Sequence, residues 1–509
     1  MPDPEPPAPA GAASPGLQLV FGASGYVGRH LVPRLAEHGR PVRAAARRLR
    51  AMQAEGWQDR FDHVEIARAD ALDAASLAPV LEGVETAFYL VHSMTSGRGF
   101  PARDRQAAES FAAAAARAGV RRIVYLGGLA PKDTRSAHLA SRVETGDILR
   151  RGPVPVTELR AGIIVGAGSA AFEVMRDLVA HLPMMVAPKW VQVASPPVAL
   201  DDLLEDLIAL SDHPQAAGGI YETGGERLSY VQMMQRLAHA LGKRRRIIVP
   251  VPLLTPELSG MWLDLVSGVP GSVSRALIAG LRHDLDADDS ALRALVPRQP
   301  MGFDAAVART LQDETALRAT DRWREGAFDL RGERHDRSFY GKQMAAGAVT
   351  RAGPEGAWAA LEGLGTRAQG YFFATPLWRL RAGLDRLLGG RQHGPRPKGA
   401  FVPGQRFDFW RVLFAVPGRR LTLISGLVAP GDGGFEFELT PEPGGGTRIE
   451  AVIHWHPAGV WGLLYWYLMW VPHVLMLRGF VRALARVADR KAGRAGAALR
   501  RAPDAPPRR

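Results

Sequence analysis

The chain has 509 residues, 47% of them hydrophobic and 23% charged, a length and composition that predict two or three globular domains. It contains no cysteine, which excludes disulfides, thiolate nucleophiles and cysteine-ligated metal centres. The net charge is +13, and the sequence holds no zinc finger, helix-turn-helix or RNA-binding motif, so we expect no specific nucleic acid partner.

Both ends of the chain are expected to be disordered. Residues 1–15 hold six prolines and lack the charged and apolar regions of a signal peptide. Residues 491–509 form a tail rich in basic residues, alanine and proline, which we interpret as solubilising rather than as a binding segment for anionic lipid or nucleic acid. We expect a cytoplasmic protein, with peripheral contact to the inner face of a membrane as an additional possibility.

A glycine-rich turn follows the first predicted strand. The apolar run at 17–21 is followed by glycines at 22, 25 and 28 and then by a helical period. Gly22 permits a tight turn, Gly25 lets a pyrophosphate approach the backbone, and Gly28 lets the helix pack closely on the strand. Strand, turn and helix together predict a dinucleotide site at the helix N-terminus, with contacts from Gly22, Ser24, Gly25, Tyr26, Val27 and Gly28.

The end of the second predicted strand, at 41–48, indicates which nicotinamide cofactor fits. NAD sites usually place an acid here for the ribose 2′-hydroxyl, whereas an arginine accommodates the 2′-phosphate of NADP. This chain offers Arg47 and Arg48 and no acid. The sequence therefore favours NADP(H) over NAD(H), although both arginines could instead be ordinary solvated residues.

Further apolar runs at 64–70, 86–92 and 122–128 alternate with helical segments, including an alanine-rich one at 104–118. This alternation predicts a doubly wound parallel sheet of the Rossmann type. Ligands in such sheets bind at the carboxyl ends of the strands. The candidate residues at that edge include Asp70, Ala71, Leu90, Val91 and His92.

Residues 16–330 resemble the extended or atypical short-chain dehydrogenases/reductases, in particular the group that includes the nucleotide-binding accessory subunit of respiratory complex I. The resemblance is carried by Arg47, Ala69-Asp70 and the segments 22–28, 89–92, 160–166 and 196–202. It implies an NAD(P)-dependent oxidoreductase, with Asp70 near the adenine and residues 89–92 along the nicotinamide.

The sequence departs from that family at the catalytic pair. Ordinary members use Tyr-x-x-x-Lys, but none of the nine tyrosines here has a lysine four positions later. His138 and Arg142 have the same spacing in the expected place and share a helical face. In one interpretation His138 donates a proton and Arg142 holds the nicotinamide ribose. In the other, the site binds cofactor but has lost its chemistry.

Residues 182–329 are interpreted as a smaller substrate-side lobe, with helical patterns at 230–241 and 255–266. The apolar segment 183–190 contains two methionines and a tryptophan. Such residues suit an adaptable ligand surface, so this segment could lie beside the nicotinamide, or it could be a core strand and its turn.

A second domain is predicted over 335–490. Residues 354–361 predict a helix, and the runs 401–412, 420–428, 435–439 and 447–455 predict an antiparallel sheet before a long terminal helix. This order resembles the START-like helix-grip domains, which enclose an apolar cavity. The motifs at 354–358, 408–412 and 456–462 also resemble a bacterial domain of unknown function.

Two features of this domain allow alternatives. His454 and His456 share one face of a strand and could bind a metal with Asp408 or His473, but no recognised ligand spacing supports it, so we expect none. Residues 458–477 contain no Asp, Glu, Lys or Arg. We expect them to form a buried helix; peripheral membrane contact and a transmembrane span are the alternatives.

The sequence thus predicts an NADP(H)-binding oxidoreductase with a substituted catalytic pair, joined to a domain that holds a hydrophobic, quinone- or lipid-like molecule. The alternative is a non-catalytic NADP(H)-binding sensor or scaffold. The substrate and the oligomeric state are left open.

Overall fold

The computed structural model describes residues 16–53, 55–92, 99–130, 136–251, 261, 263–280, 284–316, 340–391, 393–443 and 445–499. The predicted leader, the end of the basic tail, the segment 255–260 and the predicted boundary at 330–335 lie outside these residues. The chain divides into two compact units, the first built mainly from residues up to 321 and the second mainly from residues 322–509.

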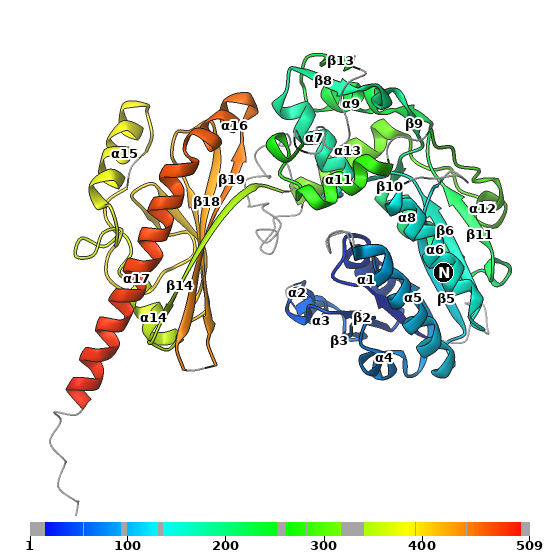
Figure 1. Ribbon diagram of the computed structural model, residues 1–509, viewed down its shortest axis with the longest axis horizontal. Helices are drawn as coiled ribbons and strands as arrows, with labels where there is room; N and C mark the ends of the chain where they lie inside the picture. The colour runs from blue at the N-terminus through cyan, green and yellow to red at the C-terminus, as the bar shows by residue number, and fades with distance from the viewer. Residues whose placement is uncertain are drawn as a thin grey trace, which may run out of the picture. The chain divides into compact units, whose positions relative to one another are not determined.

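A seven-stranded sheet forms the centre of the first unit (Figure 1). The order is β11-β6-β5-β4-β1-β2-β3, and every neighbouring pair is parallel. Its strands are β1 (Leu17–Phe21), β2 (Val42–Ala46), β3 (Val64–Arg68), β4 (Val84–Tyr89), β5 (Arg122–Gly128), β6 (Val156–Ala161) and β11 (Ile220–Thr223). The order reverses between β1 and β4, which creates the crevice where such sheets bind nucleotides.

Helices pack on both faces because successive side chains of each strand point to opposite sides. In β1, Leu19 and Phe21 face one core and Val20 faces the other. The Val20 side is covered by α1 (Tyr26–Glu37), α2 (Leu49–Gln53), α3 (Trp57–Arg60), α8 (Leu200–Asp212) and α12 (Ser290–Leu295). The opposite side is covered by α4 (Ala74–Leu81), α5 (Phe100–Arg117) and α6 (Ala137–Arg151). The predicted doubly wound fold is confirmed.

The remainder of the first unit consists of short strand pairs and helices. The pairs are β7 (Ile164–Val165) with β10 (Val198–Ala199), β9 (Ala194–Ser195) with β12 (Leu228–Ser229), and β8 (Met184–Pro188) with β13 (Ile247–Val251). The helices are α7 (Ala170–His181), α9 (Tyr230–Ala240), α11 (Gly271–Gly280) and α13 (Phe303–Ala316), with the 3₁₀ turns η2 (Lys189–Gln192) and η3 (Pro214–Ala216).

The second unit contains a six-stranded antiparallel sheet in the order β14-β19-β18-β17-β16-β15. The strands are β14 (Lys342–Thr350), β15 (Arg406–Phe407), β16 (Trp410–Val416), β17 (Arg420–Ser425), β18 (Gly431–Pro441) and β19 (Thr447–Pro457). A hairpin joins β18 to β19, as the alternating runs and their glycine turn predicted.

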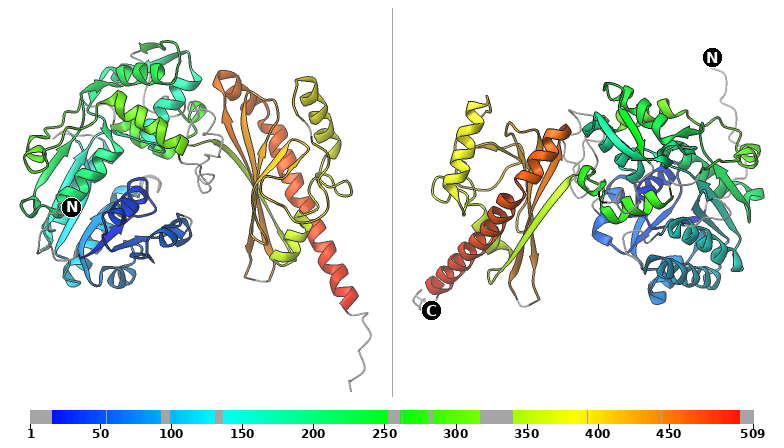
Figure 2. Two further views of the ribbon diagram at one scale, coloured as in Figure 1. Left: turned by 180° about the vertical axis from the view of Figure 1, so that it is seen from behind. Right: turned by 45° about the horizontal axis from the view of Figure 1, so that its top comes forward.

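Among the described residues, four helices accompany this sheet: α14 (Pro354–Leu361), α15 (Thr375–Leu387), α16 (Gly459–Leu468) and α17 (Trp470–Leu499). The long helix α17 lies along one face, where Phe480 packs on Phe435 and Phe437 (Figure 2). A long terminal helix on an antiparallel sheet agrees with the predicted element order, while the START-like assignment stays a prediction. Residues 491–499, expected to be disordered, continue α17 because their alanines favour helix.

The apolar stretch 458–477 is not one buried helix, and that prediction is wrong. It forms α16 and the start of α17, with Leu463, Trp466 and Leu477 buried and several other large side chains exposed. Among the described residues no single helix is long and apolar enough to cross a bilayer. The pair Gly459–Leu468 and Trp470–Gly493 meets that requirement jointly but bends by 56° at the break.

Candidate functional site

The glycine turn between β1 and α1 has the geometry of a phosphate cradle. Gly22 has a φ of +99°, and a Cβ at Gly28 would lie 2.5 Å from the carbonyl oxygen of Gly22. Gly28 therefore allows α1 to pack against the turn. Gly25 is the N-cap of α1 and supplies no side-chain cap, and the first turn holds no acid. The amide groups and the positive helix dipole there fit a pyrophosphate.

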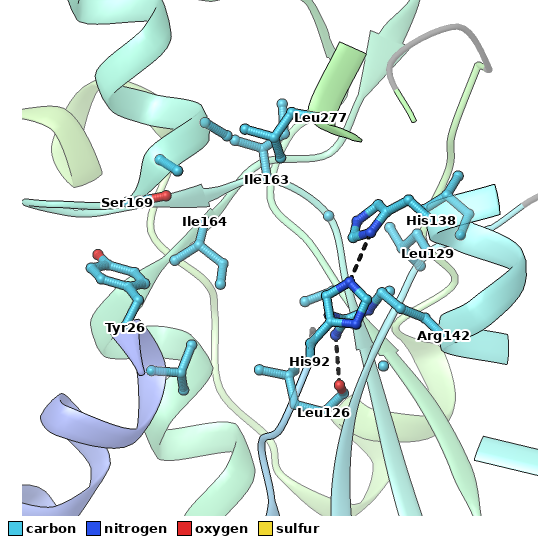
Figure 3. A pocket seen from close by; sticks show the side chains of 18 of the residues that line it. Tyr26, His92, Leu126, Leu129, His138, Arg142, Ile163, Ile164, Ser169 and Leu277 are labelled. Carbon is cyan, nitrogen blue, oxygen red and sulfur yellow. Dashed lines mark hydrogen bonds between the residues drawn. The ribbon is translucent and has the colours of Figure 1, made fainter. Parts of the chain in front are cut away.

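A cavity of about 350 Å³ opens beside this turn. Its walls come from the turn and the start of α1, from the ends of β4, β5 and β6, and from α6, α7, α9 and α11 (Figure 3). The lining is mostly apolar. Its residues with polar side chains are Tyr26, His92, His138, Arg142, Ser169, Ser195 and Tyr230.

Three side chains from different elements form a hydrogen-bonded chain at one wall. His92 Nε2 lies 2.9 Å from His138 Nδ1, as Figure 3 shows, and His92 Nδ1 lies 2.8 Å from a carboxylate oxygen of Asp104. Asp104 is buried on α5 and also accepts a hydrogen bond from the Ser141 hydroxyl at 3.1 Å. His138 lies at the start of α6 and ends this hydrogen-bonded chain. His92 and His138 line the cavity.

The carboxylate of Asp104 assigns the protons along this chain. An ionised carboxylate only accepts, so His92 donates from Nδ1 and accepts at Nε2 from the Nδ1–H of His138. This leaves Nε2 of His138 as a proton acceptor. Burial lowers the pKa of His92, and burial together with unfavourable electrostatic interactions with the His92 ring and Arg142 lowers the pKa of His138 to about 3. Both rings are therefore neutral at neutral pH.

The lowered pKa of His138 predicts a pH-dependent stability. The unfolded chain takes up a proton near its ordinary pKa of about 6.5, whereas the folded site resists protonation until about pH 3. The stabilisation that comes from neutral His138 is fully present above about pH 6.5. Below that pH the free energy of unfolding falls by up to about 1.4 kcal/mol per pH unit. Urea unfolding of the ligand-free protein between about pH 7 and 5 measures this slope. A His138→Asn variant with an equally steep slope would exclude His138 as its source.

Arg142 is placed by β5. Its Nη2 donates to the carbonyl oxygen of Leu126 at 2.6 Å, and the Tyr125 hydroxyl donates to the Arg142 carbonyl at 2.8 Å. A Cβ at Gly128 would lie 3.0 Å from Arg142 Nε, so the glycine leaves room for the guanidinium. Nε is buried and makes no hydrogen bond within the described residues. His138 and Arg142, predicted to act together, thus line the same cavity.

The predicted cofactor contacts divide into two groups. Gly25, Tyr26, Val27, Gly28, Leu90, Val91 and His92 line the cavity. Gly22 and Ser24 form the turn just outside the lining. Arg47 and Arg48 follow β2 and are exposed. Asp70 and Ala71 follow the neighbouring β3, where Asp70 is partly exposed and Ala71 is buried. All four lie at the same edge of the sheet but outside the cavity lining. Asp70 accepts a hydrogen bond from the Leu72 amide at 3.1 Å.

One sequence interpretation does not agree with this site, and three residues of the site were not predicted. Residues 183–188 include β8, whose Met184 and Val186 are exposed and which contributes no residue to the cavity lining described above. Conversely, Asp104, Ser195 and Tyr230 were not among the predicted site residues. A signal for Asp104 was present, because it shares the buried face of α5 with Ala107, Ala108 and Phe111 at helical spacing. No local sequence signal pointed to Ser195 or Tyr230, because β9 and the start of α9, which carry them, are far along the chain from the glycine turn.

The predicted metal candidates of the second unit have other partners. His454 Nε2 lies 3.2 Å from a carboxylate oxygen of buried Glu436, and Asp408 accepts a hydrogen bond from the Tyr371 hydroxyl at 2.7 Å. Within the described part of the chain, no group of three or more His, Asp or Glu side chains is arranged to hold a metal ion.

Comparisons with known proteins support a nicotinamide cofactor. Residues 22–151 match a family described as NAD(P)H-binding, and residues 340–480 match DUF2867, a family of proteins of unknown function. A ceramide reductase from Caulobacter vibrioides is 27% identical over 262 residues, which are 50% of this chain and 80% of the relative. A (4-alkanoyl-5-oxo-2,5-dihydrofuran-3-yl)methyl phosphate reductase from Streptomyces griseus is 35% identical over 144 residues, which are 28% of this chain and 46% of the relative.

Solved structures resemble the first unit. The triphenylmethane reductase of Citrobacter sp., complexed with NADP(H), matches with a TM-score of 0.46 and 18% identity over 58% of this chain and 99% of its own. An NADPH-dependent quinone oxidoreductase from Escherichia coli, complexed with NADPH, matches with a TM-score of 0.46 and 19% identity over the same shares. The first unit thus contains a Rossmann-type parallel sheet whose residues 22–151 match a family described as NAD(P)H-binding, and the second unit matches a family of unknown function.

Proposed function

We propose that the protein is an NADP(H)-dependent reductase that delivers a hydride and a proton to a hydrophobic carbonyl or quinone compound. The observation that carries this proposal is the hydrogen-bonded chain from Asp104 through His92 to His138, which ends in the cavity beside the glycine turn. A buried carboxylate behind two histidines is an arrangement that moves and stabilises a proton.

The residues present fit the cofactor. The uncapped start of α1 and the space at Gly25 and Gly28 suit the pyrophosphate, and the unpartnered Nε of Arg142 suits a ribose hydroxyl. A bound nicotinamide supplies the hydride. The remaining lining residues, including Leu129, Ile163 and Leu277, form the apolar wall against which a substrate would lie.

His138 supplies the proton in this proposal. Its Nε2 first accepts a proton from solvent, and Asp104 stabilises the resulting positive charge through His92. His138 then donates that proton to the substrate oxygen as the hydride reaches carbon, so a carbonyl becomes an alcohol and the ring returns to its neutral form. In the reverse direction Nε2 accepts the hydroxyl proton. Reduction should therefore become faster as the pH falls.

The preference for NADP(H) rests on Arg47 and Arg48. Both are exposed at the end of β2, where a 2′-phosphate would lie. Replacing both by alanine should weaken NADPH binding by about 10- to 100-fold and leave NADH binding unchanged, because only the 2′-phosphate loses its charged partners. Fluorescence titration measures both constants. Arg121→Ala, at the opposite end of the sheet, is the matched control. If the Arg47/Arg48 double variant lost NADPH and NADH binding equally, the assignment of these arginines to the 2′-phosphate would be contradicted.

The substrate class is inferred from the apolar lining and from two further observations. One relative is named a ceramide reductase, and ceramide is a lipid. The second unit is expected from its sequence to be START-like, and a domain of that kind would hold an apolar molecule. The direct test is NADPH oxidation, followed by absorbance, with a panel of long-chain ketones and quinones. Sustained turnover that His138→Asn abolishes supports the proposal.

A non-catalytic NADP(H)-binding protein is the second candidate. It is favoured by the missing Tyr-x-x-x-Lys pair and by the neutral state of His138, which holds no transferable proton on Nε2 at neutral pH. Tight NADPH binding without turnover across the same panel, including at acidic pH, would support this candidate and contradict the reductase.

A further inference from the structure

The second unit carries a helix whose apolar side faces outward. Helix α15 is amphipathic, and its leucines recur at helical spacing from residue 377 to residue 388. An amphipathic helix on a soluble domain normally buries such a face. Here the large side chains on it are exposed, with Leu387 83% accessible: Leu377, Leu380, Leu384, Leu387 and Leu388.

The orientation of α15 is fixed by contacts of its other side. Asp385 is fully buried, and its carboxylate accepts a hydrogen bond from the Val428 amide at 2.6 Å. Arg381 donates to the Val428 carbonyl at 3.2 Å and lies 3.8 Å from Asp385. Just before the helix, Phe373 covers Gly479 of α17. A rotation that buried the leucines would break these contacts, so their exposure is part of the folded structure.

Helix α16 presents a second apolar face at the same end of the sheet. Its inner side packs through Leu463 and Trp466, while Trp461 and Leu468 are each 73% exposed. The helix starts against the loop that holds α15: Ala458 donates to the Pro430 carbonyl at 2.9 Å, two residues from Val428. Figures 1 and 2 show α15 and α16 at this same end of the second unit in every view.

The charges around these helices are almost all positive. Residues 363–407 contain a single acid, the buried Asp385, and residues 451–488 contain none. Exposed basic residues accompany the apolar faces: Arg379, Arg386 and Arg391 on and after α15, and Arg478 and Arg482 on α17. Apolar side chains that include tryptophan, bordered by arginines, match the composition of helices that lie in the interface of an anionic bilayer.

We propose that α15, α16 and the first turns of α17 form a surface that docks the protein on anionic membranes. The exposed leucines and tryptophans would enter the boundary between headgroups and acyl chains, and the arginines would contact lipid phosphates. The 56° break between α16 and α17, together with the packing of Trp466 and Phe480 into the core, favours a surface position rather than a span. The inference is independent of the proposed reductase activity.

Vesicle flotation of the full-length protein tests this proposal. We expect binding to vesicles of phosphatidylcholine with phosphatidylglycerol and clearly weaker binding to phosphatidylcholine alone. The double variant Leu380→Glu/Leu384→Glu and the variant Trp461→Ser should each reduce binding by about ten-fold or more, because each removes apolar contact and the former adds charge repulsion. Val349→Glu changes an equally exposed apolar residue on β14 and should leave binding unchanged.

Circular dichroism and NADPH binding of each variant show that the protein remains folded. Two results would overturn the proposal. One is equal or absent binding to both kinds of vesicle. The other is concentration-dependent self-association that Leu380→Glu/Leu384→Glu abolishes, without vesicle binding, which would assign the same surface to a second copy of the chain.

Discussion

Replacing His138 by asparagine should lower the rate of reduction by about 100- to 10,000-fold while NADPH binds with unchanged affinity. Asparagine can occupy much of the space of the ring and still contact His92, but it cannot accept and release a proton near neutral pH. Single-turnover oxidation of NADPH separates this chemical step from binding. The effect should be largest at acidic pH, where the native site is most active.

His38→Asn is the matched control for this prediction, because His38 is exposed at the end of α1. Asp104→Asn adds a second test of the chain. An amide in place of the carboxylate removes the negative charge that stabilises protonated His138, and it can present a donor as well as an acceptor to His92 Nδ1, so it no longer fixes the His92 tautomer. A reductase that keeps its full rate in His138→Asn or in Asp104→Asn would not use this proton path.

Replacing Gly28 by valine should strongly weaken cofactor binding and also destabilise the first unit. A Cβ at this position would lie 2.5 Å from the Gly22 carbonyl oxygen and 2.8 Å from the Ala23 Cα, and backbone atoms cannot move aside as a flexible side chain does. We expect the start of α1 to shift, with a loss of about 1–3 kcal/mol in the free energy of unfolding. A shift of this kind would weaken NADPH binding by about 100-fold or more.

Thermal unfolding with and without NADPH measures both effects, since a ligand that binds the folded state raises the melting temperature. Gly302→Val is the control, because a Cβ there meets no atom within 4 Å. Unchanged NADPH stabilisation in Gly28→Val would show that the glycine turn does not hold the cofactor.

The sequence was most informative where a local pattern requires one structure. The glycines at 22, 25 and 28 between an apolar run and a helical period predicted the first strand, turn and helix, and the alternation that follows predicted the parallel sheet. Strands of an α/β sheet are continuous apolar runs, so their positions agree closely with the observed bounds. The strands β16 to β19 of the second unit were recognisable from alternation and turns, whereas β14 (Lys342–Thr350) was not predicted.

The proton path could not be predicted in full, because it depends on contacts between distant elements. Asp104, His92 and His138 come from α5, the end of β4 and α6, and no sequence spacing relates them. His92 and His138 were each singled out from the sequence, but the only local signal for Asp104 was its place on the buried face of α5. Likewise, an apolar helix predicts burial, and the outward faces of α15 and α16 became visible only when Asp385 and Pro430 fixed their orientation.

The most direct test of the central claim, that the first unit is an NADP(H) site, is titration of the purified protein with NADPH and separately with NADH, followed by nicotinamide fluorescence. The glycine turn together with Arg47 and Arg48 predicts micromolar binding of NADPH and much weaker binding of NADH. Failure to bind either cofactor would contradict the claim and would make the glycine turn a structural feature only.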